Sequence, residues 1–207
     1  MGERGRARWL LTGGVIGPIL FVVVFLIEGW TRPDYDPLRM FVSLLSLTDA
    51  GWQQIANFVA SGALIAGGAV GLRTVLRDGP ECRWGPRLIG LAGVGLIMAG
   101  VFVTDPAQGY PPGAPLGLTA NPSWHGAIHQ AASTFVFIGL PVAMLVMAPR
   151  FAFEGSRWAL YSRLSAVGVL VFLFSAFAFT DITGLLQRLA ILLALGWVGQ
   201  IMWRFRR

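Results

Sequence analysis

The two histidines of the chain are the residues whose type and spacing most directly suggest chemistry. His125 and His129 are the only histidines in 207 residues, and a spacing of four places both on one face of a helix, about 6 Å apart along its axis. Asn121 is a favourable N-cap and Pro122 a favourable first helical residue, so we expect the helix to begin there. The positive end of the helix dipole disfavours protonation of His125. A neutral imidazole is suited to ligate a metal, accept a proton or form a hydrogen bond.

Two aspartates end apolar segments in similar sequence contexts. Asp105 follows Phe-Val-Thr and Asp181 follows Ala-Phe-Thr. A carboxylate at a helix C-terminus meets the negative end of the dipole, so we expect a compensating cation such as an arginine or a metal. Alternatively, Asp105 begins a turn and Asp181 caps the next helix. A tetrahedral zinc site would combine both histidines with one of these aspartates and a water. The candidate metal ligands are therefore His125, His129, Asp105 and Asp181.

The elements that position these residues are membrane-spanning helices. Apolar residues make up 55% of the chain, charged residues only 13%, and the mean hydropathy is +0.66. This composition is typical of an integral membrane protein and predicts one all-helical domain over residues 1–207. Six segments have the length needed to cross about 30 Å of hydrocarbon. They are residues 9–29, 52–72, 88–104, 124–148, 164–180 and 185–203.

The arginines predict the orientation of these spans. All 16 basic residues are arginines, and thirteen of them fall on one side of the predicted spans. The positive-inside rule then places both termini in the cytoplasm. We expect the protein to reside in the plasma membrane. The positive charge alternates with apolar segments, which argues against a nucleic-acid partner. The expected partner is the lipid bilayer.

This topology gathers the other polar residues at the outer ends of the helices. We expect a short helix over 37–47 that lies in the interface, with Arg39, Ser43 and Ser46 along one polar stripe. In the alternative arrangement the stripe turns inward as a lid over the histidines. Candidate catalytic residues are then Asp105, His125, His129, Ser43 and Ser46, and candidate substrate-binding residues are Arg39, Arg188 and Glu28.

Several segments together resemble a family of bacterial and archaeal membrane proteins, domain of unknown function 998 (DUF998). They are Gly13 to Glu28 with Pro18, residues 32–37, Ser43 to Ser46, residues 51–53, Phe102-x-x-Asp105-Pro, the His125 to His129 helix and residues 184–188. The resemblance spans nearly the whole chain and implies a six-helix membrane protein without an established activity. The family often has an acid and a leucine after a serine of the first outer loop, whereas Ser46 precedes Leu47 and Thr48 here.

A second similarity is to membrane hydrolases related to alkaline ceramidases and adiponectin receptors, which hold zinc with histidines, an aspartate and a serine. The chain departs from them in its six spans, its two histidines and its outward-facing polar cluster. One hypothesis is thus a metal-dependent hydrolase that acts on a lipid or lipid-linked substrate, with Arg39 binding an anionic head group. Alternatives are a structural, lipid-binding or partner-binding protein without catalysis, and a transporter of an ion or small solute. Transport is less consistent with spans two, three and five, which hold almost no ionisable residue at mid-membrane.

Overall fold

The chain folds into a set of long helices. A computed structural model describes residues 2–76, 79–119, 121–152 and 156–206. The α-helices are α1 (Glu3–Thr31), α2 (Trp52–Val75), α3 (Pro80–Val101), α4 (Trp124–Phe137), α5 (Gly139–Ala152), α6 (Ser156–Ala178) and α7 (Thr183–Arg206). Three short 3-10 helices, η1 (Val42–Ser46), η2 (Asp49–Gly51) and η3 (Thr180–Ile182), lie in the connections. The predicted all-helical class is confirmed.

Six helical stretches of the described chain are long and apolar enough to cross a membrane. They are Glu3–Thr31, Asp49–Val75, Glu81–Val101, Trp124–Ala152, Arg157–Ala178 and Thr180–Arg206. Each of the six segments predicted from hydropathy overlaps one of them. Large apolar side chains along these helices are exposed, as expected of helices surrounded by lipid rather than water. The protein is therefore a multi-pass membrane protein.

The fourth span is divided into two helices. α4 ends at Phe137 and α5 begins at Gly139, with Ile138 between them. Pro141 has no amide hydrogen to donate to the Phe137 carbonyl, and its ring crowds that carbonyl, so a regular helix is interrupted one turn before the proline. Neighbouring amides bridge the break, because Ile138 N donates to Thr134 O at 2.9 Å and Val142 N donates to Ile138 O at 3.1 Å.

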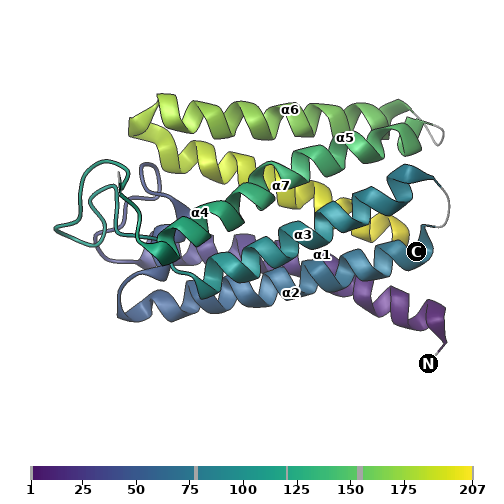
Figure 1. The fold of residues 1–207 in the computed structure, drawn as a ribbon, viewed down its shortest axis with the longest axis horizontal. Helices are drawn as coiled ribbons and strands as arrows, with labels where there is room; N and C mark the ends of the chain where they lie inside the picture. The colour runs from purple at the N-terminus through teal and green to yellow at the C-terminus, as the bar shows by residue number, and fades with distance from the viewer. Residues whose placement is uncertain (1, 77–78, 120, 153–155, 207) are drawn as a thin grey trace.

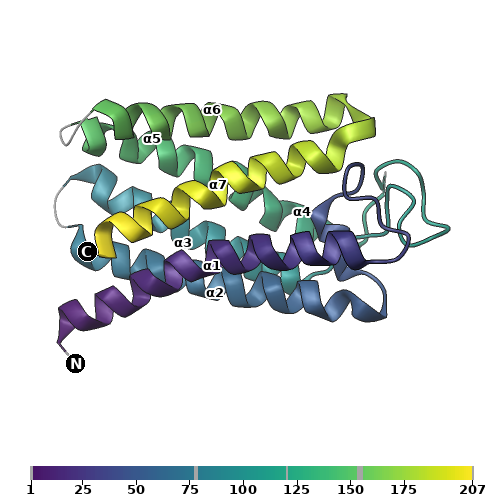
Figure 2. The same cartoon turned by 180° about the vertical axis from the view of Figure 1, so that it is seen from behind.

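The helices run along the long axis of the molecule, with the long connections at one end and the chain termini at the other (Figures 1 and 2). The connections 32–51, 102–119 and 121–123 gather at one end, which we call the loop end, and both termini lie at the opposite end (Figures 1 and 2). This agrees with an even number of spans. Which end faces the cytoplasm stays a prediction from the arginine distribution.

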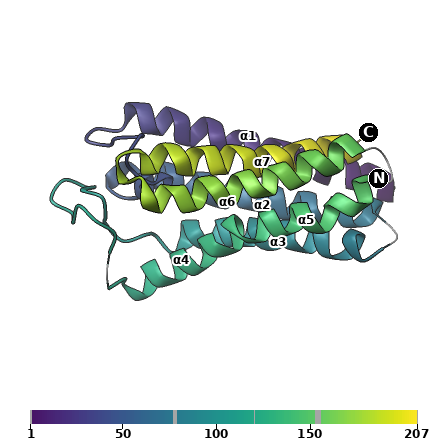
Figure 3. The ribbon, with the colours of Figure 1, turned by 90° about the horizontal axis from the view of Figure 1, so that it is seen from above.

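The helices pack closely on one side of the bundle and less closely on the other. A Cβ on Gly14 of α1 would lie only 2.9 Å from the Cα of Gly68 of α2, so these helices approach at a distance that glycine permits. By contrast, α4 contacts α6 and α7 only sparsely and stands apart from them toward the loop end (Figure 3). Three of the polar residues singled out from the sequence, Ser43, Asp105 and His129, lie around this loosely packed region.

Candidate functional site

The helix with both histidines begins later than predicted. The N-cap of α4 is Ser123, whose hydroxyl accepts a hydrogen bond from Gly126 N at 3.1 Å. The prediction of Asn121 as N-cap and Pro122 as first helical residue is therefore wrong. Asp105 completes the cap, since its Oδ2 accepts from Ser123 N at 2.9 Å and its Oδ1 from Ser123 Oγ at 2.6 Å.

Asp105 lies at the positive end of a helix, contrary to the expectation from its position after α3. α3 ends at Val101, four residues earlier, and the Asp105 carboxylate sits over the first turn of α4. The α4 dipole and the Ser123 donors stabilise its charge, so it needs no separate cation. Gly126 makes room for it, because a Cβ on Gly126 would overlap Asp105 Oδ2.

Both histidines bind the end of α3. His125 Nδ1 is 2.8 Å from Val103 O, and His129 Nδ1 is 2.9 Å from Ala99 O and 3.0 Å from Phe102 O. Carbonyl oxygens only accept, so Nδ1 carries the proton in both rings. Ala99 O is one of the last carbonyls of α3, which lack partners within the helix, and His129 satisfies it. His125 binds Val103 O, two residues beyond the end of α3, so both histidines join α4 to this junction.

The predicted zinc site is not assembled. In the part of the chain that the structure describes, no group of three or more histidine, cysteine or acidic side chains is placed to hold a metal ion. Asp181 is 87% exposed, and its carboxylate lies 3.7 Å from the guanidinium of Arg39. The set of His125, His129, Asp105 and Asp181 is therefore divided between two locations, and the zinc-hydrolase hypothesis loses its ligand set.

A cavity of about 430 Å³ lies beside His129 and Asp105, near the loop end. Its walls are mostly apolar side chains of α1, α2, α3, α4, α6 and α7. They include Phe21, Phe58, Leu96, Val136, Phe137, Leu173, Phe177, Ile191 and Leu195. Its polar lining residues are Ser43, Thr104, Asp105, Thr119, His129, Gln130, Ser133, Thr134 and Gln187. It occupies the space left where α4 stands apart from α6 and α7.

The connection 32–51 covers this cavity, because four of its residues, 41–44, line it. The expected interfacial helix over 37–47 does not form; the segment is a turn followed by the 3-10 helix η1, and Val42, Leu44, Leu45 and Ser46 are buried. Side chains bind its backbone: Phe41 N donates to Gln108 Oε1 at 2.9 Å, and Val42 N to Gln187 Oε1 at 2.8 Å. Ser46 Oγ donates to the Ser43 carbonyl, and Ser43 lines the cavity. We call residues 40–46 the roof segment.

Arg188 holds the roof segment instead of lining the cavity. This residue is 6% exposed, and its guanidinium donates to Met40 O at 2.9 Å, Gly184 O at 3.0 Å and the Tyr35 hydroxyl at 2.6 Å. Tyr35 in turn donates toward the Met40 and Phe41 carbonyls. Burial raises the pKa of Tyr35 from its ordinary value of 10 to about 12, against the opposing effect of Arg188. The contacts of Arg188 are those of a structural anchor.

Arg39 lies outside the cavity. Its side chain is 62% exposed and forms ion pairs at 3.7 Å with both Asp36 and Asp181. Exposed pairs of this length contribute little to stability. Arg39 therefore does not take the position over the histidines that the alternative lid arrangement would give it, whereas Ser43 lines the same cavity as His129.

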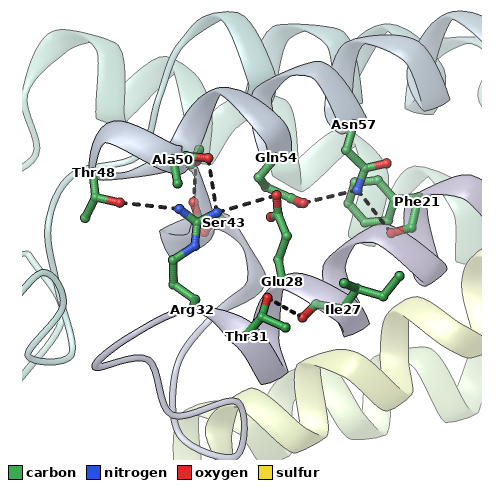
Figure 4. A network of polar contacts seen from close by, with 11 residues as sticks. Phe21, Ile27, Glu28, Thr31, Arg32, Ser43, Thr48, Ala50, Gln54 and Asn57 are labelled. Atoms are coloured by element: carbon green, nitrogen blue, oxygen red, sulfur yellow. Dashed lines mark hydrogen bonds and ion pairs between the residues drawn. The ribbon is translucent and has the colours of Figure 1, made fainter.

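A second polar cluster lies between α1 and α2 (Figure 4). Glu28 is 5% exposed, and its Oε1 is 3.5 Å from Arg32 Nη2. Neither carboxylate oxygen has a hydrogen-bond partner among the described residues, and neither has Gln54 Nε2, which is also buried. Figure 4 shows the Glu28 carboxylate beside the Gln54 side chain, with Arg32 on its other side bonded to Ala50 O at 3.1 Å. Glu28 was expected at the outer face, but its position next to Gln54 of α2 was not.

The amides of α2 continue this cluster into the bundle. Asn57 Nδ2 donates to Gln54 Oε1 and to Phe21 O, both at 3.1 Å, and Ser61 Oγ donates to Asn57 Oδ1 at 3.2 Å. Sequence reasoning missed these residues. A signal existed, because Gln54, Asn57 and Ser61 stand at i, i+3 and i+7 and thus share one face of an otherwise apolar span.

Comparison with known proteins identifies a family. The model of a family described as "Protein of unknown function (DUF998)" matches residues 15–204, nearly the whole chain. No curated protein and no solved structure matches the chain.

Proposed function

We propose that this chain, which belongs to the DUF998 family, binds an amphiphilic molecule with an uncharged polar head in the cavity beneath the roof segment. The proposal rests on one observation: a cavity of about 430 Å³ whose walls are mostly apolar and whose polar lining residues include Ser43, Asp105 and His129. Cavities of this size, mostly apolar with a few placed polar groups, are typical of small-molecule sites.

The walls support an apolar ligand body. Aromatic and branched aliphatic side chains from six helices line the cavity. An apolar chain that replaces water or empty space there gains van der Waals contacts with these side chains, so its binding is favourable. The cavity lies within helices that are apolar enough to span a membrane, so ligands dissolved in the bilayer are at high local concentration beside it. A lipid-derived molecule is therefore the expected class.

The polar lining supports an uncharged head. Among the described residues that line the cavity there is no arginine, and the single acid, Asp105, already accepts two hydrogen bonds from Ser123. An anionic head would be desolvated without a countercharge, which is strongly unfavourable. A hydroxyl or amide head has suitable partners, because the Ser43 hydroxyl donates or accepts and His129 Nε2 accepts.

Two phenylalanine variants of α4 test the proposal. Ser133 lines the cavity, whereas Ala131, two residues earlier, is exposed and does not. Protein purified in detergent would be extracted, and the small molecules that accompany it quantified by mass spectrometry. We expect an uncharged amphiphile near one per protein in the wild type and in Ala131→Phe, and at least a fivefold loss in Ser133→Phe. Equal amounts in both variants would leave the cavity as a packing defect of a purely structural protein.

A further inference from the structure

A second hollow lies on the lipid-facing side of α1 and α7. It has a volume of about 670 Å³ and is bordered by α1 from Val15 to Val23, by α7 from Leu192 to Arg204, and by Trp158 of α6. We call it the α1–α7 groove. Its walls belong to membrane-spanning helices, so whatever fills it comes from the bilayer or from another membrane protein.

Two glycines leave the floor of this groove open. A Cβ on Gly196 would meet nothing within 4 Å, and one on Gly199 would lie 3.8 Å from Pro18. Apolar side chains on both banks are partly exposed, with Ile19 at 58% and Leu192 at 40%. The floor is therefore smooth and apolar over about one helical turn, which suits a flexible acyl chain.

One end of the groove carries a cation between aromatic rings. Arg204 lines the groove beside Gln200 and Trp203, and its guanidinium carbon is 4.9 Å from the centre of the Trp158 ring. Arginine is suited to phosphate because its planar donors match two phosphate oxygens at once. Tryptophans are enriched where a helix leaves the hydrocarbon, which is the depth of a phospholipid head group. The polar end of the groove therefore lies at the level of lipid phosphates.

We propose that the α1–α7 groove binds an anionic glycerophospholipid, with one acyl chain over Gly196 and Gly199 and the phosphate at Arg204. The shape and chemistry of the groove favour a lipid over a second copy of the chain, because an open apolar floor that ends at an arginine beside two tryptophans matches the acyl chain and phosphate of one lipid molecule. This inference is independent of the ligand in the cavity beneath the roof segment.

The charge of the head group provides the first test. Native mass spectrometry would compare phosphatidylglycerol with phosphatidylcholine of identical acyl chains. We expect wild-type protein to retain the anionic lipid at least fivefold more, and Arg204→Gln to lose this preference. The control is Arg206→Gln, because Arg206 stacks on Trp203 at 4.1 Å and does not line the groove. A preference that persists in Arg204→Gln, or disappears equally in both variants, would overturn the proposal.

The floor of the groove provides the second test, which also applies if Arg204→Gln does not fold. Gly196→Leu introduces a side chain into open space and is expected to lower retention of both lipids at least threefold. Gly139→Leu is the control, since a Cβ at Gly139 also meets nothing within 4 Å and Gly139 lies outside the groove. Unchanged retention in Gly196→Leu, or a dimer that only Gly196→Leu abolishes, would contradict the lipid and indicate another occupant.

Discussion

The α3–α4 junction and the α1–α2 cluster both bury polar side chains near the loop end, but they satisfy them differently. At the junction, Asp105 and His129 form hydrogen bonds to a capping serine and to backbone carbonyls. In the α1–α2 cluster, the Glu28 carboxylate and Gln54 Nε2 have no hydrogen-bond partner among the described residues. The residues with the more reactive side chains are thus the ones engaged in holding helices together.

This difference teaches that residue type alone is a poor guide to a site. A buried polar group whose bonds all end on backbone contributes to stability and has little capacity left for a ligand. A buried polar group without hydrogen bonds is unfavourable by about 1–3 kcal/mol, more if charged, and at Glu28 the ion pair with Arg32 offsets part of this.

The largest effect is expected at His129. His129→Ala removes a buried ring and leaves the Ala99 and Phe102 carbonyls without their donor, so we expect a loss of about 3 kcal/mol in the free energy of unfolding. Chemical unfolding in mixed micelles would measure it. His125→Ala is the matched control, because His125 is half-buried and makes one such contact. Equal losses in the two variants would mean that the carbonyl contacts of His129 are not what stabilises the junction.

The second effect is a pH dependence of stability that comes from Tyr35, whose buried hydroxyl binds the roof segment. Its pKa of about 12 in the folded protein exceeds the unfolded value of 10, so the folded state keeps a proton that the unfolded state loses. The contribution of Tyr35 to the free energy of unfolding is complete below pH 10 and is lost as the pH rises from 10 to 12. It amounts to roughly 2–3 kcal/mol in total. Unfolding experiments across this range should show a steeper decline in wild type than in Tyr35→Phe. Parallel curves would show that the Tyr35 hydroxyl titrates normally.

Gly126 tests the cap of α4. A side chain in Gly126→Ala would displace the Asp105 carboxylate from Ser123, and we expect a loss of about 2 kcal/mol, the upper range for a cap. Combining it with Asp105→Ala should restore part of the loss relative to the sum of the single variants, because the overlap disappears. Strict additivity in this double-mutant cycle would place the Asp105 carboxylate elsewhere.

Glu28 should show the smallest effect. Glu28→Gln removes a buried charge that lacks hydrogen bonds, and it also removes the 3.5 Å contact with Arg32. The two changes oppose each other, so the free energy of unfolding is expected to change by less than about 1 kcal/mol. The same unfolding assay measures it, with Asp105→Asn as the isosteric reference at the junction. Breaking a well-bonded buried ion pair lowers the free energy of unfolding by about 3 kcal/mol or more. A loss of that size in Glu28→Gln would show that Glu28 is as well satisfied as the side chains at the α3–α4 junction.

The spans were predictable because burial in lipid imposes a simple rule on composition. Six runs of apolar residues were enough to indicate six spans, whereas the division of the fourth span at Ile138 is seen only in the structure. The start of α4 was misplaced by a few residues because Asn121-Pro122 has the form of a helix start, while Ser123 gains a second partner in Asp105. That partner is eighteen residues away, and local sequence does not reveal it.

The roof segment and the α1–α2 cluster could not be predicted in the same way. The conformation of 40–46 depends on Gln108, Gln187 and Arg188, which lie at least 67 residues further along the chain. Hydrogen bonds from so far away override any helical preference of residues 37–47. At Glu28 the sequence indicated a polar residue at a span end, but the missing hydrogen bonds are a property of packing between two helices.

The attachment of the roof segment to α7 also constrains how the protein is made. Residues 40–46 leave the ribosome early, yet Gln187 and Arg188, which bind their backbone, belong to α7 and are synthesised about 140 residues later. The chain between the first two spans therefore waits for the sixth before it acquires these hydrogen bonds. Nascent chains truncated before α7 would insert their spans with the roof segment unattached and the cavity beneath it open on the α7 side.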